Sequence, residues 1–99
     1  MAKFILTNRA VEDLGKIWNY TFDNWSENQA DKYYLNLLRI CQTIADSPTL
    51  GKNYYDILEG LHGMKVNSHI IFYRKIEPGN VEIIRILHGS MDLKNQIGQ

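Results

Sequence analysis

Histidine, lysine and arginine side chains that could carry acid–base chemistry are concentrated in the second half of the chain. The histidines are His62, His69 and His88, and the cations near them are Lys65, Arg74 and Arg85. Histidine transfers protons near neutral pH, and a cation stabilises the charge that develops when a phosphodiester is cleaved. One hypothesis is therefore RNA cleavage, with His88, Arg85, Arg74 and Lys65 as the catalytic residues.

The alternative interpretation of these residues is structural. For His88 we favour a hydrogen bond where a strand becomes a turn, because the sequence identifies no second titrating group beside it. For Arg74 and Arg85 the structural alternative is a salt bridge to Asp92 or Glu82. For the two arginines we favour partner binding, because guanidinium groups on an apolar sheet face need acidic partners when they are covered.

The sequence gives little support for nucleophilic hydrolysis, for a phosphate-binding loop or for metal chemistry. Cys41 lies on the apolar stripe of a predicted helix, which is typical of a buried structural thiol. The chain contains no Gly-x-Ser-x-Gly motif and no glycine-rich phosphate-binding loop. Its histidines and its one cysteine lack the spacing of metal ligands, so we expect no metal and no cofactor.

A predicted β-hairpin across residues 67–92 positions these side chains. Its strands contain Ile70–Tyr73 and Val81–Ile86, and the turn between them is Glu77-Pro78-Gly79-Asn80. Pairing Ile76 with Val81 would place Lys75 opposite Glu82 and Phe72 beside Arg85. In this register one face carries Ile70, Phe72, Arg74, Ile83, Arg85 and Leu87. A sheet face that mixes apolar residues with arginines suggests that something else covers it, such as a tail of the chain, a partner or a substrate.

The rest of the chain predicts one α+β domain spanning residues 1–99, in the order β-α-α-β-β-β. The segments are a strand at Lys3–Leu6, a helix capped by Thr7 or Asn8, a helix from the Ser26 cap to Asp46, and a strand at Leu61–Val66. We expect an N-terminal strand, then a helical hairpin, then a three-stranded antiparallel sheet, with the helical hairpin packed on one face of the sheet. The other face would be open, and residues 93–99 would form a short polar tail with one helical turn at most.

Aromatic residues recur at helical spacing in both predicted helices. They are Trp18, Phe22, Trp25, Tyr33 and Tyr34. We interpret most of them as core, with some apolar area left exposed when a partner is absent. Gly15 interrupts the first helix, and the close approach of another helix is one explanation.

Bulk properties narrow the class of protein. Eleven basic and eleven acidic residues leave no net charge, which argues against a general nucleic-acid binder. A single cysteine favours the reducing cytoplasm. From the short apolar runs of the sequence we expect neither a signal peptide nor a membrane-spanning segment.

Several motifs resemble the ParE branch of the RelE/ParE toxin superfamily over nearly the whole chain. They are Ala10–Leu14, Ile17–Tyr20, Gln29–Ala30 with Tyr33 and Leu37, Asp46-Ser47-Pro48-x-x-Gly51, Ser68–Arg74 and Arg85–Asp92. The last of these, Arg-Ile-Leu-His-x-x-x-Asp, is the most specific.

The resemblance implies a cytoplasmic toxin of a type II toxin–antitoxin system, with growth arrest and plasmid maintenance as associated roles. It implies inhibition of DNA gyrase by protein binding, neutralisation by a ParD-like antitoxin, and contact with operator DNA only through that antitoxin. We expect an amphipathic antitoxin segment to cover the open sheet face. The predicted antitoxin-binding residues are Phe72, Arg74, Ile83, Arg85 and Leu87.

The RelE branch of the superfamily, whose members cut messenger RNA on the ribosome, supplies the alternative. The catalytic arginine positions of that branch fall here on Ile70 and Ser90, and its lysine positions fall near Leu61 and Gly63. Its C-terminal tyrosine has no counterpart, because no tyrosine follows Tyr73. These departures favour the gyrase inhibitor over a ribosome-dependent endonuclease.

Overall fold

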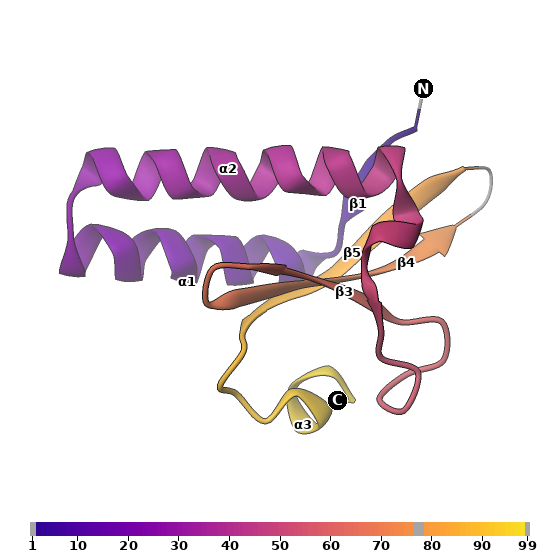
Figure 1. The fold of residues 1–99 in the computed structure, drawn as a ribbon. Helices are drawn as coiled ribbons and strands as arrows, with labels where there is room; N and C mark the ends of the chain where they lie inside the picture. Colours follow the sequence, from indigo (N-terminus) through magenta and orange to yellow (C-terminus); the bar gives the residue numbers. More distant parts are fainter. Residues whose placement is uncertain (1, 77–78, 99) are drawn as a thin grey trace.

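The computed structural model describes residues 2–76 and 79–98. The elements are β1 (Phe4–Leu6), α1 (Asn8–Asn24), α2 (Glu27–Asp46), the 3-10 turn η1 (Pro48–Leu50), β2 (Lys52–Asn53), β3 (His62–Val66), β4 (His69–Ile76), β5 (Asn80–His88) and α3 (Leu93–Ile97). The α+β class and the helical hairpin are as predicted (Figure 1). Glu77 and Pro78 of the predicted turn lie outside the described residues.

Five strands form one sheet in the order β1-β5-β4-β3-β2. β1 runs parallel to β5, and the other neighbours are antiparallel. The prediction of a three-stranded antiparallel sheet is therefore wrong in its detail. β1 pairs with β5, the last strand of the chain, and such a pairing between distant segments cannot be predicted from local pattern.

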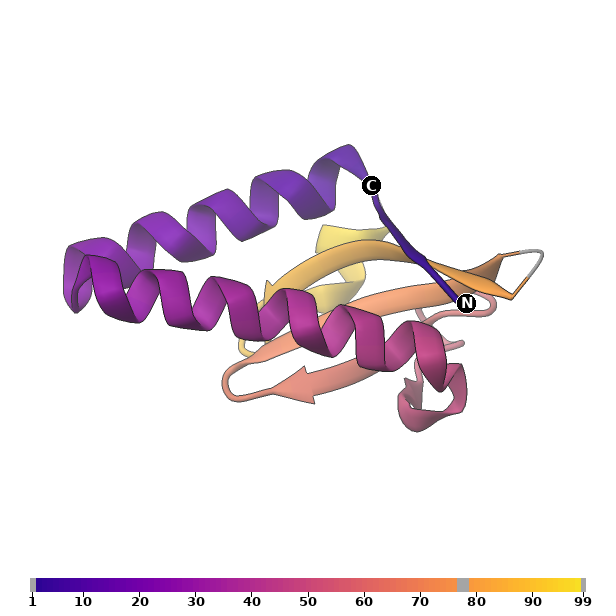
Figure 2. The same ribbon diagram turned by 90° about the horizontal axis from the view of Figure 1, so that it is seen from above.

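Side-chain caps start both long helices where the sequence predicts. The Thr7 Oγ1 accepts a hydrogen bond from the Ala10 amide at 3.1 Å, and the Ser26 Oγ accepts one from the Gln29 amide at 3.1 Å. α1 and α2 then run antiparallel on one side of the sheet (Figures 1 and 2). Their apolar stripes pack on the sheet residues Ile71, Tyr73, Val81, Ile83 and Ile86 to form the main core.

The opposite face of the sheet has a second, smaller core. Its buried members are Leu61, Ile70, Phe72, Leu87 and Ile97, with Tyr54, Ile57 and Leu93 against them. Ile97 and Leu93 belong to α3, which lies on the side of the sheet away from α1 and α2 (Figure 1). The prediction of an open face is wrong, because the C-terminal residues expected to be a polar tail contribute apolar side chains that cover it.

A β-bulge changes the register of the central hairpin. Phe72 pairs with Arg85 as predicted, but the register shifts between Phe72 and Tyr73, so that Arg74 pairs with Glu82. The predicted Lys75–Glu82 pair is therefore wrong, and Lys75 pairs with Val81 instead. One extra residue on β5 also moves Ile83 to the helix side of the sheet, away from the face assigned to it.

Candidate functional site

The four residues predicted for catalysis do not share one site. Arg85 and His88 line a small cavity of about 110 Å³, whose lining includes neither Lys65 nor Arg74. Arg74 forms an ion pair with Glu82 at 3.3 Å on the half-exposed surface of the hairpin. This pair is one of the two structural alternatives that the sequence suggested for Arg74.

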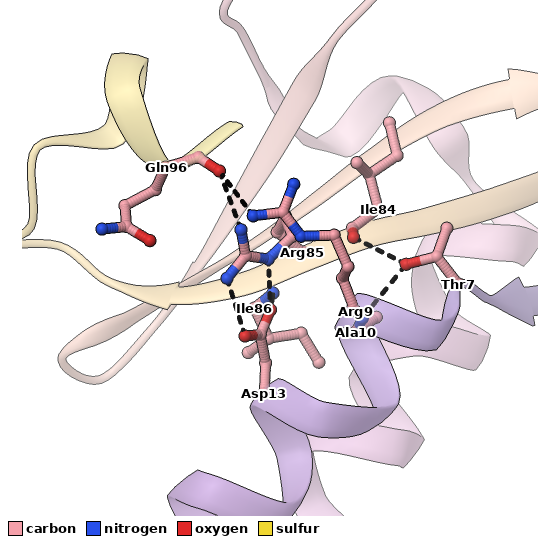
Figure 3. Close-up of polar contacts among 8 residues, drawn as sticks. All are labelled: Thr7, Arg9, Ala10, Asp13, Ile84, Arg85, Ile86 and Gln96. Carbon is pink, nitrogen blue, oxygen red and sulfur yellow. Dashed lines mark hydrogen bonds and ion pairs between the residues drawn. The ribbon is translucent and has the colours of Figure 1, made fainter. Parts of the chain in front are cut away.

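Arg85 is buried in a polar clamp that joins α1, β5 and α3 (Figure 3). Its Nε donates to Asp13 Oδ2 at 2.7 Å, and its Nη2 donates to Asp13 Oδ1 at 2.9 Å. Its Nη1 donates to the Gln96 carbonyl at 2.8 Å, and Arg9 Nη2 donates to the same oxygen at 3.2 Å. The predicted partners Asp92 and Glu82 are wrong for this arginine, because Asp13 of α1 provides the carboxylate.

Asp13 is the buried acid that sequence reasoning missed. β1 covers the edge of β5 only as far as Ile83, so the next stretch of that edge is free. Asp13 fills the gap by accepting the Ile86 backbone N–H at 3.0 Å as well as both guanidinium bonds. The hydrogen bonds that Arg85 donates to Asp13 hold the pKa of Arg85 above its usual value. The pair is thus internally neutralised, which removes Arg85 as a free anion-binding group.

His88 does have a titrating neighbour, and it is His69. The two residues are paired across β4 and β5, with ring centroids 5.5 Å apart. Burial lowers the pKa of His69, and repulsion from His88 lowers it further. The lack of such a neighbour is therefore no longer a reason to prefer a structural role for His88, but the predicted hydrogen bond is confirmed, because the Ser90 amide donates to His88 Nδ1 at 3.1 Å where β5 becomes a turn.

Hydrogen bonding assigns a proton to each ring. The Tyr33 hydroxyl contacts the Val66 carbonyl at 3.1 Å and His69 Nδ1 at 2.8 Å. The carbonyl can only accept, so the tyrosine proton goes there and His69 Nδ1 donates to Tyr33. The Ser90 amide donates to His88 Nδ1 at 3.1 Å, which makes that nitrogen an acceptor. The remaining nitrogens are thus an acceptor at His69 Nε2 and a donor at His88 Nε2.

The predicted antitoxin-binding residues are mostly inaccessible. Phe72, Ile83 and Leu87 are buried, and Arg85 is held in the clamp. Arg74 retains 48% of its side-chain exposure. The expectation that these residues line an uncovered face is wrong. Contact between them and an antitoxin stays a prediction. For Phe72 and Leu87 it would require α3 to move, and Ile83 lies on the other side of the sheet under the helical hairpin.

An accessible hollow lies elsewhere, at the far end of the helical hairpin. It measures about 370 Å³ and is lined by Tyr20, Thr21, Trp25, Gln29, Tyr33, Asn67, Ser68 and His69. Trp25 is 75% exposed and Tyr20 66% exposed, so the interpretation of Trp25 as core is wrong. The hairpin projects beyond the sheet in Figure 1, which leaves its tip without a surface to pack on. The apolar pattern could not reveal this, because it records periodicity and not the extent of the sheet.

The described residues contain neither a metal-binding cluster of His, Cys, Asp and Glu side chains nor a membrane-spanning helix. Within residues 2–76 and 79–98, no three side chains of His, Cys, Asp or Glu are grouped to hold a metal ion. In the same part of the chain, no helix has both the length and the apolar character of a membrane span.

Comparison with known proteins gives one consistent family. Residues 4–93 match the model of the family described as the ParE toxin of the type II toxin–antitoxin system parDE. The chain is 35% identical over 98 residues to Toxin ParE1 of Caulobacter vibrioides, covering 99% of this chain and 100% of that toxin. It is 29% identical over 96 residues to Toxin ParE1 of Mycobacterium tuberculosis, covering 97% and 98%.

A solved structure supports the fold. The chain superimposes on a protein described as the chromosomal ParDE TA system from P. aeruginosa with a TM-score of 0.73 and 16% sequence identity. The match covers 89% of this chain and 95% of the other. At this identity the likeness concerns the fold alone.

Proposed function

The chain belongs to the ParE toxin family of type II toxin–antitoxin systems, and from this membership we propose that it inhibits DNA gyrase by protein binding. We propose protein binding rather than catalysis because of the polar clamp around Arg85. Arg85 is committed to Asp13 and Gln96, and Lys65 and Arg74 lie outside the cavity that contains His88. A cation already neutralised by a buried carboxylate cannot also stabilise a phosphodiester transition state.

A ParD-like antitoxin is the partner that we propose to neutralise the toxin. Supporting this, the similar P. aeruginosa protein is described as part of a ParDE system. The chain has no net charge, which is consistent with contact to operator DNA only through the antitoxin. When the antitoxin is lost, the toxin would be free to act in the cytoplasm and to arrest growth. Arrest of cells that have lost the genes would in turn favour maintenance of a plasmid that carries them.

The direct test is DNA supercoiling by purified gyrase in the presence of purified toxin. We expect linear, cleaved DNA to accumulate with toxin concentration, because a gyrase poison traps the enzyme on cut DNA. Addition of the protein encoded next to this chain should prevent the cleavage. Unchanged supercoiling at a large molar excess of toxin would exclude gyrase as the target.

A ribosome-dependent RNA endonuclease remains the second candidate, favoured by one observation. His69 lies beside His88, so two imidazoles are within reach of the same cavity. Primer extension after induction would map messenger cuts, and His88→Ala should abolish them. His62→Ala is the matched control, because His62 contacts Tyr55 and Tyr73 and not this cavity. Growth arrest that persists in the His88 variant would eliminate the nuclease hypothesis.

A further inference from the structure

The small cavity beside the polar clamp is lined by three side chains with soft, uncharged donor atoms. They are His69, His88 and Met91, which offer imidazole nitrogens and a thioether sulfur. Imidazole groups bind copper, and thioethers select the monovalent ion Cu(I). The trio differs from a cluster of His, Cys, Asp and Glu, because its third member is a methionine.

Strand pairing, rather than sequence spacing, brings the two histidines together. The Gly89 amide donates to the Ser68 carbonyl at 2.8 Å, and the two kinds of pair alternate along an antiparallel ladder, so the adjacent His69–His88 pair is a non-hydrogen-bonded one. Side chains approach most closely at such pairs, and the ring centroids are 5.5 Å apart. An ion bound roughly 2 Å from one nitrogen of each ring keeps the centroids within roughly 6.5 Å, so this spacing allows both rings to bind one ion.

A tight turn returns Met91 to the same cavity. The Met91 amide donates to the His88 carbonyl at 3.1 Å, which closes a four-residue turn at the end of β5. The Met91 side chain is 46% exposed and lines the cavity, so the cavity reaches solvent there and an ion has an entry path. Met64, in contrast, lies on β3 and packs against the main core.

Each imidazole ring is held at Nδ1 and is unfilled at Nε2. His69 Nδ1 donates to the Tyr33 hydroxyl at 2.8 Å, which leaves the lone pair of its Nε2 available. His88 Nδ1 lies 2.6 Å from Ser90 Oγ. Within residues 2–76 and 79–98, neither Nε2 atom has a hydrogen-bond partner. Histidines that bind metals are generally oriented in this way, by a hydrogen bond at the second nitrogen.

Binding of an ion at His88 Nε2 requires the ring proton to move. Without an ion this proton is on Nε2, because Nδ1 accepts from the Ser90 amide. When the ion takes its place, the proton moves to Nδ1, where Ser90 Oγ at 2.6 Å accepts it. The ring stays neutral and no net proton is released. The Ser90 amide loses its acceptor at small cost, because it is exposed and can bind water instead.

The charges around the cavity favour a monovalent ion. Lys16 lines the cavity, is exposed and has no ion pair within the described part of the chain. Coulomb repulsion from its ammonium group is twice as large for a divalent ion as for a monovalent one. Hard ions such as Mg²⁺ and Ca²⁺ need oxygen ligands, and the oxygens of Asp13 are engaged by Arg85 and the Ile86 amide.

We propose that His69, His88 and Met91 form a binding site for Cu(I). The ion joins the start of β4 to the turn after β5, so its binding stabilises the folded chain. Imidazoles that hold an ion are unavailable for proton transfer, so the bound ion also disables the acid–base pair on which an RNA endonuclease would depend. The site needs neither gyrase nor an antitoxin, and its test is therefore independent of the proposed function.

The test is titration of the purified full chain with Cu(I), without oxygen and in competition with a coloured Cu(I) chelator. His69→Ala and Met91→Leu should each weaken binding by at least about 10- to 100-fold, the range found when only a residue that orients a metal ligand is lost. His62→Ala and Met64→Leu are the matched controls, because neither residue lines the cavity, and they should bind like the wild type. Circular dichroism melting of each variant verifies that the fold is intact.

Two further measurements report coordination directly. Ag(I), a soft monovalent ion that does not change oxidation state here, should shift the methyl resonance of Met91 in NMR spectra. It should also move the ring proton of His88 from Nε2 to Nδ1, which a merely structural histidine would not show. Tyr33→Phe removes the hydroxyl that orients His69 and should weaken Cu(I) binding although all three ligands are intact.

Three outcomes would overturn the proposal. The first is equal Cu(I) affinity of the wild type and His69→Ala. The second is an equal loss in His62→Ala, which would show an adventitious ion only, bound to accessible histidines in general. The third is tighter binding of Zn²⁺ than of Cu(I), with Met91→Leu unchanged, which would exclude a soft monovalent ion as the occupant.

Discussion

The polar clamp around Arg85 and the aromatic tip of the helical hairpin both include residues of α1, and they have opposite characters. The clamp consists of charged residues, yet it is buried and its hydrogen-bonding groups are satisfied. The tip consists of aromatic residues, yet Trp25 and Tyr20 are among the most exposed large side chains of the described chain. Residue type alone would assign function to the first and core to the second.

The comparison shows that the solvent exposure of a side chain, rather than its chemical type, decides whether it is available to another molecule. A buried guanidinium with a bidentate carboxylate holds elements together and is unavailable to another molecule. Aromatic side chains without a packing surface are available to a partner, and they cost little conformational entropy to immobilise. Four measurements would break or sharpen this contrast.

The largest effect is expected at the clamp. Asp13→Ala leaves Arg85 buried without its carboxylate, which should lower the free energy of unfolding by about 3–5 kcal/mol. Urea denaturation followed by circular dichroism measures the change. Glu12→Ala, at the exposed neighbouring position, should have little effect. A loss below about 1 kcal/mol for Asp13→Ala would show that the clamp is not structural.

Gly15 lies on α1 between the two regions, and it tests whether the helix is constrained there. A Cβ at this position would meet nothing within 4 Å, so the explanation by close helix approach is wrong. Gly15→Ala should therefore raise stability by roughly 0.5–1 kcal/mol through the helix preference of alanine. Gly51→Ala is the contrasting variant, because its Cβ would collide with the Tyr73 hydroxyl and should destabilise the chain.

Acid should destabilise the surroundings of His69, where β4 begins beside Tyr33 and His88. The pKa of His69 is lowered by burial and by His88, so the unfolded chain binds the proton more tightly than the folded one. Stability is therefore expected to fall as the pH drops below the unfolded value of about 6.5 and to stop falling, for this group, below the folded value. His69→Gln should therefore flatten the dependence of melting temperature on pH. Equal slopes in the wild type and the variant would contradict this.

The smallest effect on stability is expected at the tip. Trp25→Ala should change the free energy of unfolding by less than about 0.5 kcal/mol, because the side chain is three-quarters exposed. Urea denaturation of the variant beside the wild type measures the change. A large stability loss would mean that Trp25 packs in solution and that the contrast with the clamp is overstated.

Much of the fold followed from local pattern. Thr7 and Ser26 cap the helices, Pro48 follows the end of α2, and alternating apolar residues mark β4 and β5. These signals are local because capping, turn formation and periodicity depend on residues a few positions apart. They were also enough for the resemblance to ParE toxins, since its motifs lie on the same elements.

The sequence by itself determined the helices, the central hairpin and the family. Tertiary structure alone decided which arginine is buried, which face is covered and which aromatic residues remain accessible. Arg85 and its carboxylate are 72 residues apart, and they meet because β1 covers the edge of β5 only as far as Ile83 and α1 lies beside the next stretch of that edge. Contacts of that separation depend on how elements dock, which no short-range pattern encodes.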